Sequence, residues 1–401
     1  MIVIAAPYSP FDRSAQPNLG AARKIEAVIG ILCGFDPDVV LINTAHNSED
    51  PQGPTSQRTE VAGRQITEFT PRTYDKRKVG KLLNLFEVKS IVDRVMQRGV
   101  PQLVWLYNGY AMESLLAVEF RRRGAGCTIL ELEDAHFARG RGLNPKPLVD
   151  WLTFRRSIRS VDHVFAVNEA LRKYAGRHVA STSLFPGVIQ QGLIDACEQR
   201  APFQPGSDLV HVGYFGGLTR EKGADRVLAL AGKLGRGFKL HVCGGGEMSS
   251  LFRDAQASLG VERLVFHGLV DDKQLNRLIA ACDVLLNLHS PIQAMGDGVF
   301  PFKVLESVAS GRLLVSTRVP GEGLAEMLQG AVFVDDAEEH QLEAVRSARA
   351  TFLSRKATVE RGAALTRSSF STSAFAHKVQ AIAASSSGRR GNTLRERPDE
   401  V

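Results

Sequence analysis

Residues 209–223 read LVHVGYFGGLTREKG and decide the fold of the second half of the chain. The apolar run Leu209 to Phe215 is typical of a buried strand, and the Gly216-Gly217 pair after it is typical of a tight turn. A short polar loop with Lys222 then leads into a helical pattern. Glycines let the backbone approach an anion, and a helix start offers unpaired amides, so the segment suits a diphosphate. An ordinary strand-to-helix turn would show the same pattern.

Short apolar runs alternate with helical patterns along the whole chain, which is typical of parallel sheets built from strand-helix-strand units. The expected strands are Ile2–Ala6, Val39–Asn43, Gln102–Tyr107, Cys127–Leu132, His163–Val167, Ser181–Phe185, Leu209–Phe215, Phe238–Cys243, Leu264–His267, Val284–Leu288, Leu313–Ser316 and Val332–Val334. We therefore expect an α/β protein with two Rossmann-like, doubly wound parallel-sheet domains that face each other across a cleft. Open α/β sheets bind ligands at such carboxyl ends.

The expected domain boundaries follow from composition. Residues 1–198 form an N-terminal Rossmann-like domain, and the polar segment 199–208 (QRAPFQPGSD) has the prolines and glycine of a linker. Residues 209–370 form a second Rossmann-like domain, and a helix over 371–384 returns to the first. The tail 385–401 (SSSGRRGNTLRERPDEV) offers no apolar surface, so we expect it to be disordered.

The overall composition excludes several classes of protein. The chain has 401 residues, 44% hydrophobic and 23% charged, which is typical of a folded soluble protein rather than a disordered one. No apolar run reaches the roughly 18 to 20 residues of a membrane-spanning helix, and the opening apolar stretch lacks a basic leader. Its five cysteines are scattered without a CxxC pair, so neither a disulfide framework nor a structural zinc is expected.

Positive charge is concentrated in residues Arg72 to Arg98, which hold eight Lys or Arg against three acids. Apolar residues recur among them at helical spacing, so we predict a basic amphipathic helix. It could present a solvated basic face, or it could contact anionic lipid or a phosphate-bearing acceptor. A nucleic-acid partner is not expected, because the chain has no recognisable nucleic-acid motif and only 7% aromatic residues.

A second glycine-rich segment, residues 296–311, reads GDGVFPFKVLESVASG. We expect its helix to begin near Pro301 or Phe302, with free amides at the helix start. Lys303 and Glu306 are three residues apart and share one helix face, so the lysine could meet a phosphate oxygen while the carboxylate accepts two ribose hydroxyls. A surface salt bridge between the two would explain the same spacing.

Together these segments resemble a known family. VGYFGGLTREKG at 212–223, followed by FPFKVLESVASG at 300–311, resembles the donor-binding half of the retaining nucleotide-sugar glycosyltransferases of family 4, glycosyl transferases group 1. These enzymes have the two-Rossmann B-type fold. VFHG at 265–268 and CDVLLNLHS at 282–290 also match, whereas the first half matches only at Asn18 to Gly20, at LELED before Ala135 and at FPG before Val188.

The resemblance implies roles for individual residues. Lys222 would neutralise the donor diphosphate, Glu306 would hold the ribose hydroxyls, and the amides of Val299 and Phe300 would meet the distal phosphate. The implied donor-binding residues are Gly20, Gly216, Gly217, Arg220, Lys222, Gly298, Val299, Phe300, Lys303 and Glu306. The candidate catalytic residues are Asp134, Asp297 and Lys222, and the acceptor-side candidates are Glu133 and His136. Asp134 could equally be a helix cap or a loop carboxylate.

The chain departs from the family at three positions. Gly217 stands where an arginine is usual, so half of the diphosphate clamp is missing unless Arg220 reaches in. Gly298 stands where the family has the first of two paired glutamates, and Glu133 where it often has a histidine. Some members with a similar donor loop also lack the first glutamate.

We therefore expect an enzyme that transfers a sugar, with retention, from a nucleotide-diphosphate sugar of UDP or GDP type. The acceptor would be a saccharide or lipid-linked saccharide of cell-surface glycan synthesis, and the protein would be cytoplasmic or peripheral on the inner membrane face. No cofactor and no metal are expected, because lysines and amides would stabilise the leaving diphosphate. A non-catalytic nucleotide-sugar-binding protein or a nucleotide-sugar epimerase of similar fold are the alternatives. Redox chemistry is disfavoured because no GxGxxG follows the first strand.

Overall fold

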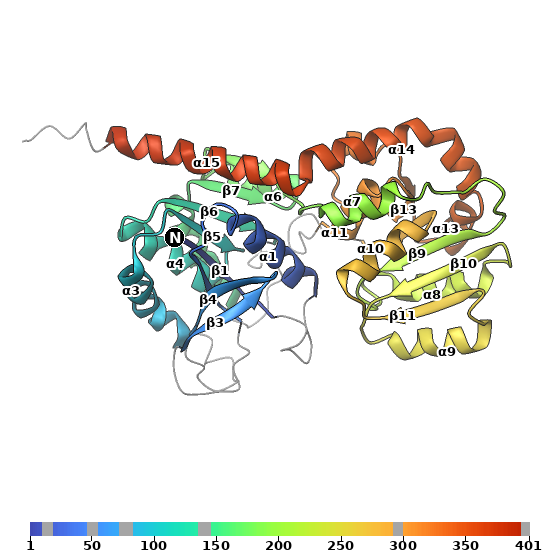
Figure 1. Ribbon diagram of the computed structural model, residues 1–401, viewed down its shortest axis with the longest axis horizontal. Coiled ribbons are helices and arrows are strands. Elements are labelled where there is room, and N and C mark those ends of the chain that lie inside the picture. Colours follow the sequence, from blue (N-terminus) through green and yellow to red (C-terminus); the bar gives the residue numbers. More distant parts are fainter. Residues whose placement is uncertain (10–18, 46–54, 72–82, 135–145, 292–299, 394–401) are drawn as a thin grey trace, which may run out of the picture. The chain divides into compact units, whose positions relative to one another are not determined.

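The computed structural model describes residues 1–9, 19–45, 55–71, 83–134, 146–291 and 300–393, and the chain forms two compact units (Figure 1). The first unit contains Met1–Val188 and the chain from Thr372 onward. The second contains Ile189–Ile292 and Phe300–Ser371. Each unit is an α/β structure around one sheet, as expected from the alternation of apolar runs and helical patterns.

The first unit has an eight-stranded sheet in the order β3-β4-β2-β1-β5-β6-β7-β8. Its strands are β1 (Ile2–Ala6), β2 (Val39–Asn43), β3 (Thr55–Val61), β4 (Arg64–Thr70), β5 (Leu103–Tyr107), β6 (Cys127–Leu132), β7 (His163–Ala166) and β8 (Thr182–Leu184). All neighbouring strands are parallel except β3, which pairs antiparallel with β4. Without the edge strands β3 and β8, the order β4-β2-β1-β5-β6-β7 is that of a doubly wound Rossmann sheet.

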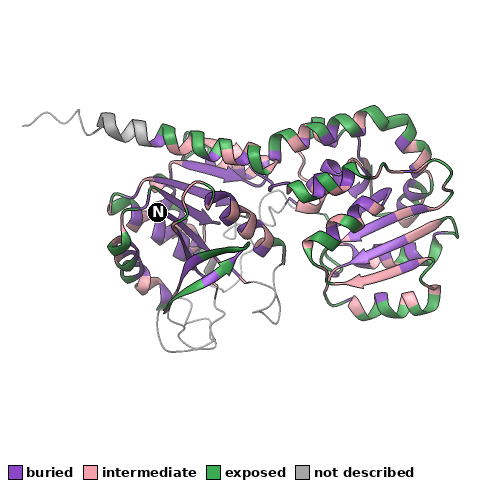
Figure 2. Ribbon diagram, viewed as in Figure 1, coloured by how far each residue is buried: buried purple, intermediate pink, exposed green. Residues whose placement is uncertain are grey.

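Helices cover both faces of this sheet. They are α1 (Leu19–Leu32), α3 (Val88–Arg98), α4 (Ala111–Arg122), α5 (Lys146–Ser157), α6 (Glu169–Ala175) and α15 (Thr372–Thr393), with the short 3-10 turns η2 (Asn84–Glu87) and η4 (Ile158–Ser160). α3 and α5 both pack against α4, whereas α15 packs against α1 and β6. Figure 2 shows that the central strands are buried while the helices keep exposed outer faces.

An aromatic cluster holds α15 to the first unit. The rings of Phe185 and Phe375 are stacked with centroids 4.3 Å apart, and Trp105 meets Phe375 edge to face at 5.7 Å. Phe165 stacks on Trp105 at 5.5 Å. All four side chains are buried, so residues from opposite ends of the chain share one core.

The hairpin of β3 and β4 was not predicted. Its sequences, TSQRTEV and RQITEFT, are mostly polar, because it lies at the edge of the sheet. Only a few of its side chains, such as Val61 and Ile66, enter the core. The strands are joined by Ala62 and Gly63, both with positive φ (51° and 71°), as in the tight two-residue turns of hairpins.

The second unit has a six-stranded parallel sheet in the order β11-β10-β9-β12-β13-β14. Its strands are β9 (Val210–Phe215), β10 (Phe238–Cys243), β11 (Leu264–Gly268), β12 (Val284–Asn287), β13 (Leu313–Thr317) and β14 (Val332–Val334). Its helices are α7 (Gln191–Glu198), α8 (Ala224–Lys233), α9 (Ser249–Leu259), α10 (Asp272–Ala281), α11 (Phe302–Ala309), α12 (Ala325–Leu328), α13 (Glu338–Arg346) and α14 (Ala348–Phe370). This is the strand order of a Rossmann fold, with the direction of winding reversed between β9 and β12.

Two boundaries differ from those expected from composition. The chain passes into the second unit at Ile189, before the expected 199–208 linker, because α7 packs against α10 of that unit. The tail expected to be disordered from residue 385 instead continues α15 to Thr393, and Ser386 is buried with its hydroxyl 3.4 Å from Cys127 Sγ. Small residues can pack closely where large apolar ones are absent, which composition alone does not indicate.

The basic segment is partly described. Residues 72–82 lie outside the described residues, and Leu83 is followed by η2 and then α3. Val88, Ile91, Val92 and Val95 of α3 are buried. Its exposed positions include Lys89 and Arg94. The described part is therefore an amphipathic helix whose apolar face is already packed within its unit.

Candidate functional site

Gly216, Gly217 and Lys222, three of the predicted donor-binding residues, lie in the loop that follows β9, whose neighbour in the sheet is β12. These strands are neighbours at the point where the strand order reverses, which is where open α/β sheets bind ligands. β9 leads directly into Gly216 and Gly217, and β12 leads to His289 two residues after it ends. The fold therefore brings the two sequence segments to one edge of the sheet.

Backbone hydrogen bonds fix the position of the Gly-Gly turn. Gly216 has φ 149° and donates its N–H to Cys243 O at 2.9 Å, and the next apolar residue, Leu218, donates to Gly245 O at 2.9 Å. A Cβ at Gly244 would lie 1.8 Å from Gly216 O, so only glycine fits there. The loop after β10 thus supports the turn. We did not single out the Gly244–Gly246 run, although its position directly after an apolar strand was visible in the sequence.

Two lysines flank this turn from different elements. A Cβ at Gly216 would lie 3.7 Å from Lys303 Cδ, and one at Gly217 would lie 3.7 Å from Lys222 Cγ. Lys303 extends from the first turn of α11 and places its Nζ 4.4 Å from the centroid of the Tyr214 ring. The Tyr214 hydroxyl lies 2.9 Å from Lys222 O and therefore ties the polar loop to β9. The Gly-Gly turn therefore lies beside the side chains of both lysines.

The Nζ of Lys303 is buried and has no hydrogen-bond partner among the described residues. Burial, and secondarily the positive charge of Lys222, lower the pKa of Lys303 from 10.5 to about 7. The salt bridge with Glu306 that the spacing alone would favour is therefore not what holds this lysine. An anion placed between the two lysines would offset both the cost of burying the Lys303 ammonium and its repulsion from Lys222.

Glu306 lies on the same side of α11 as Lys303. Both side chains line a small cavity of about 10 Å³, together with Phe215 of β9 and Leu286 of β12. The shared face expected from the i,i+3 spacing is therefore present.

The remaining donor-side predictions fall in three groups. Arg220 has an exposed side chain, and its backbone N–H is held by Glu247 Oε1 at 3.3 Å. Phe300 is buried, 2% exposed, just before α11. Asp297, Gly298 and Val299, and His136 of the acceptor side, lie outside the described residues.

The acceptor-side candidate Glu133 belongs to a buried charge cluster in the first unit. Lys24 of α1 lies 2.8 Å from Glu131 Oε1 and also contacts Glu133, and Trp105 Nε1 donates to Glu131 Oε2 at 2.9 Å. Burial raises the pKa of Glu133 to about 7, with Lys24 opposing this shift and Glu131 adding to it. Burial lowers the pKa of Lys24, but the two carboxylates outweigh it and leave the pKa raised. Glu133 can therefore exchange a proton near neutral pH.

Asp134 is positioned by a residue that we did not predict. Asn108 follows β5 with φ 65° and donates from Nδ2 to Asp134 Oδ1 at 3.0 Å. Asn108 and Asp134 thus join the carboxyl ends of β5 and β6. Gly20 lies in the first turn of α1 and is exposed.

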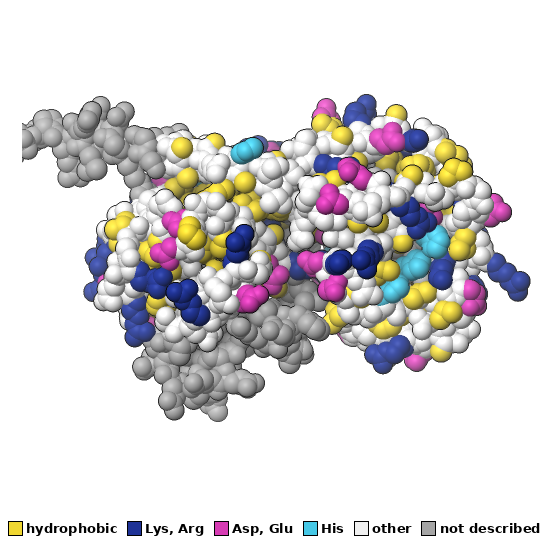
Figure 3. Space-filling view, in the orientation of Figure 1, with side chains coloured by type: hydrophobic (Ala, Val, Ile, Leu, Met, Phe, Trp, Pro, Cys, Tyr) yellow, Lys and Arg dark blue, Asp and Glu magenta, His cyan; other side chains and the backbone are white. Residues whose placement is uncertain are grey.

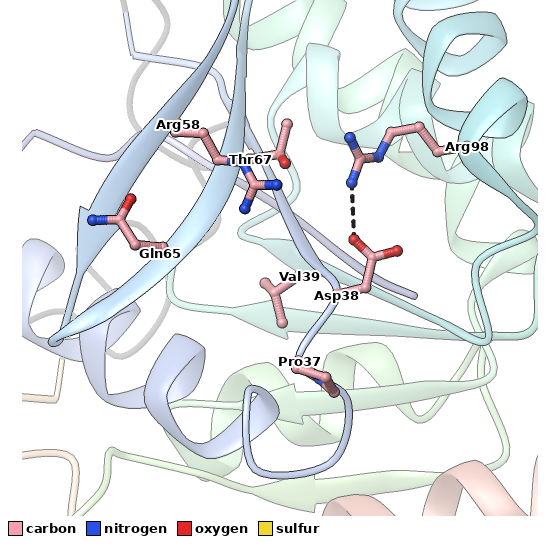
Figure 4. A pocket seen from close by; sticks show the side chains of 7 residues that line it. All are labelled: Pro37, Asp38, Val39, Arg58, Gln65, Thr67 and Arg98. Atoms are coloured by element: carbon pink, nitrogen blue, oxygen red, sulfur yellow. Dashed lines mark hydrogen bonds and ion pairs between the residues drawn. The ribbon is translucent and has the colours of Figure 1, made fainter.

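A larger hollow of about 260 Å³ lies at the opposite, amino-terminal end of β2 (Figure 4). It is lined by Pro37, Asp38, Val39, Arg58, Gln65, Thr67 and Arg98. Arg98 donates to Asp38 Oδ1 at 3.0 Å, and Asp36, two residues before Asp38, takes the N-terminal amine of Met1 at 2.5 Å. None of the predicted site residues lines this hollow, which lies at the end of the sheet that does not usually bind substrates.

Histidines gather on the second unit (cyan in Figure 3). His211, His241 and His267 stand on β9, β10 and β11, with His211 Nδ1 3.0 Å from His241 Nε2 and His241 Nδ1 3.2 Å from His267 Nε2. Burial is the main cause that lowers the pKa of His241 to about 4. Among the described residues, no group of three His, Cys, Asp or Glu is arranged to hold a metal ion.

Comparison with known families assigns the second unit. Residues 209–348 match the family model described as glycosyl transferases group 1. These residues are therefore similar to the glycosyl transferases group 1. No curated protein matches the sequence. The family match supports the coarse class of the chain, a glycosyltransferase, and agrees with the family that its motifs resemble.

Solved structures show the same fold over nearly the whole chain. Sucrose-phosphate synthase from Thermosynechococcus elongatus aligns with TM-score 0.62 and 14% identity, covering 98% of each chain. Anabaena HepE in complex with UDP aligns with TM-score 0.64 and 14% identity, covering 96% of this chain and 99% of that one. The E. coli trehalose-6-phosphate structure bound with UDP-2-fluoro glucose aligns with TM-score 0.62 and 12% identity over 96% and 99%. The chain has the B-type glycosyltransferase fold.

No helix among the described residues is both long enough and apolar enough to cross a membrane.

Proposed function

We propose that the protein is a retaining glycosyltransferase that moves a sugar from a nucleotide-diphosphate sugar of UDP or GDP type to a saccharide or lipid-linked saccharide. We place this reaction in cell-surface glycan synthesis. The observation that carries the proposal is the buried Lys303 ammonium without a hydrogen-bond partner among the described residues, beside Gly216 and close to Lys222. A buried unpaired cation is costly, so its presence at a ligand-binding edge supports an anionic ligand there.

The chemistry that these residues could perform is stabilisation of the leaving diphosphate. As the bond between the sugar and the phosphate breaks, negative charge grows on the phosphate, and two preplaced ammonium groups lower the barrier to that step. Glu306 would accept the ribose hydroxyls of the same donor. Asp134, and Asp297 outside the described residues, are the proposed carboxylates for the positive charge at the anomeric carbon.

The complex of HepE with UDP supports a uridine nucleotide among the two proposed bases, because that protein shares the fold over nearly its full length. The similarity to glycosyl transferases group 1 supports a sugar donor rather than a dinucleotide cofactor. We further propose that lysines and amides replace a metal at the diphosphate.

We also propose that the enzyme works in the cytoplasm at the inner face of a membrane. The basic segment Arg72–Arg98 supports this location, and so do the exposed side chains of α5. Leu148 and Leu152 of α5, one turn apart, are 59% and 53% exposed, and the last turn carries Arg155 and Arg156. Exposed apolar side chains beside arginines suit an anionic bilayer surface.

The test of the donor site is binding followed by turnover. The purified protein is titrated with UDP, GDP and their sugars, and compared with Lys222→Ala and with the control Lys356→Ala, whose lysine is exposed on α14. We expect Lys222→Ala to lose about ten- to a hundredfold in rate, since a charged hydrogen bond contributes about 1.5 to 3 kcal/mol. Equal turnover by Lys222→Ala would contradict the assignment. Binding without turnover would indicate a non-catalytic binder, and donor conversion without acceptor an epimerase.

A further inference from the structure

We propose that His289 is a positioning residue that holds the Lys222 ammonium at the diphosphate edge of the second unit. The inference rests on the proposed function, because it explains how one half of the donor-phosphate site is kept in place. His289 follows β12 and is 5% exposed. Its Nε2 lies 3.2 Å from Lys222 Nζ.

The hydrogen bonds of His289 select one tautomer. Its Nδ1 lies 2.7 Å from Ser290 O, and a carbonyl oxygen only accepts, so Nδ1 carries the hydrogen. In the neutral ring Nε2 is then an acceptor, and an ammonium group only donates. One neutral tautomer therefore satisfies both contacts, and the second nitrogen is fixed by the bond that the first one makes.

The surroundings keep this imidazole neutral. Burial lowers the pKa of His289, and the charges of Lys222 and Lys303 lower it further, against the opposing effects of the Ser290 carbonyl and Glu221. Glu221 Oε1 lies 4.0 Å from Nε2, and its side chain is 70% exposed. Protonation would turn Nε2 into a donor and repel Lys222. The contact therefore exists only above the lowered pKa.

The backbone around His289 is held without the imidazole. His289 O accepts from Thr317 Oγ1 at 2.6 Å, Leu288 O accepts from Arg226 Nη1 at 2.8 Å, and Ser290 N donates to Glu221 O at 2.9 Å. A side-chain substitution at 289 should leave these bonds in place. Lys222 Nζ also lies 3.5 Å from the exposed carboxylate of Glu221, a contact that water screens. The imidazole is thus the buried partner that orients Lys222.

Two substitutions separate this role from a merely structural one. In His289→Gln the amide oxygen can take the place of Nε2 and accept from Lys222. In His289→Asn the shorter side chain reaches only the position of Nδ1 and can bond Ser290 O. Both replacements are polar amides and should disturb the packing to a similar extent. A difference between the two variants in nucleotide-sugar affinity therefore reports the contact with Lys222.

The experiment measures binding of a nucleotide sugar by calorimetry in the full chain. We expect His289→Asn to raise Kd about 3- to 10-fold, the value of one net hydrogen bond, and His289→Gln to restore most of this loss. In a Lys222→Met background, His289→Asn should add almost nothing, because its effect passes through Lys222. The wild-type affinity should weaken as the pH falls through the lowered pKa of His289, and His289→Gln should lack this decline. A nucleotide sugar is the probe because a terminal phosphate would itself titrate near pH 6.

Additive losses in the double variant, or equal binding by His289→Asn and the wild type, would overturn the inference. A ligand-free measurement keeps it distinct from the proposed function: nitrogen NMR of His289 should show the Nδ1–H tautomer and an Nε2 shift that changes in Lys222→Met. An unchanged shift would overturn the contact itself. The expected shift with no binding of any nucleotide would support the contact and reject the proposed donor site.

Discussion

Replacing Lys303 with methionine should make the second unit more stable while it loses affinity for the nucleotide donor. Methionine is one atom shorter than lysine, carries no charge, and can pack its thioether and methyl group beside the Tyr214 ring that Nζ now faces. The wild-type pKa of Lys303 is lowered from 10.5 to about 7. At about 1.4 kcal/mol for each tenfold change in proton affinity, the buried ammonium costs up to about 4 kcal/mol of folding free energy at pH 7.

The pH dependence gives this prediction its sign. Between pH 7 and 10.5 the unfolded chain holds more protons on this lysine than the folded chain does, so the wild-type free energy of unfolding rises with pH across that window. Lys303→Met has no such group. Its advantage over the wild type should therefore be largest below pH 7 and disappear near pH 10.5.

The assay is thermal unfolding of both proteins from pH 6 to 10.5, with and without UDP. At pH 7 without ligand, we expect the unfolding midpoint of Lys303→Met to rise by several degrees, up to about 10 °C. UDP should stabilise the wild type by mass action and the variant much less. Lys222→Met is the matched control, because its lysine is 35% exposed and its charge reaches water. A variant no more stable than the wild type at pH 7, or an advantage that does not shrink with pH, would refute the reasoning.

Four further predictions concern the rest of the molecule. Glu306→Gln should weaken nucleoside diphosphate and nucleotide sugar by similar factors in calorimetry, because the ribose is common to both; a loss in turnover alone would move Glu306 to the sugar. Activity should persist after treatment with a chelator, and a loss that magnesium or manganese restores would disprove the proposed metal independence. Anionic vesicles should retain the protein at low salt and release it at high salt, and replacing Arg155 and Arg156 with glutamine should weaken retention about tenfold or more, at about 1 kcal/mol per charge; unchanged retention would exclude α5. Because the pKa of buried His241 is lowered to about 4, the stability that its neutral form contributes should be present above pH 6.5 and lost progressively toward pH 4; a flat unfolding midpoint across that range would show that the pKa of His241 is the same in the folded and unfolded states.

Several of the strands that were predicted correctly, such as Ile2–Ala6 and Val39–Asn43, are buried along their whole length and read as apolar runs. Val39–Asn43 and Phe238–Cys243, for example, have the same bounds in the structure. The polar edge strand Thr55–Val61 was missed because its pattern resembles a loop. The edge strand Val332–Val334 was predicted, because it is apolar. Local pattern therefore identifies apolar strands, at the centre or at the edge of a sheet, better than polar ones.

Contacts between distant residues could not be read from local spacing. Lys24 and Glu133 are 109 positions apart, and Lys222 and His289 are 67 apart, so no motif joins either pair. The Lys303 and Glu306 pair was predictable because both residues belong to one helix turn. The absence of a hydrogen-bond partner for Lys303 among the described residues is visible only when the surrounding burial is known.

The place of α15 sets the order in which the protein can be completed during synthesis. Phe375 and Val379 belong to the core of the first unit, beside Trp105 and Phe185, although they follow the whole second unit in the chain. A ribosome adds about 5 to 20 residues per second, so nearly 200 residues separate the emergence of Phe185 from that of Phe375 by about 10 to 40 seconds. During that interval the aromatic side chains of the first unit lack the cover that α15 provides. The unit that is synthesised first can therefore complete its core only after the second unit has been synthesised.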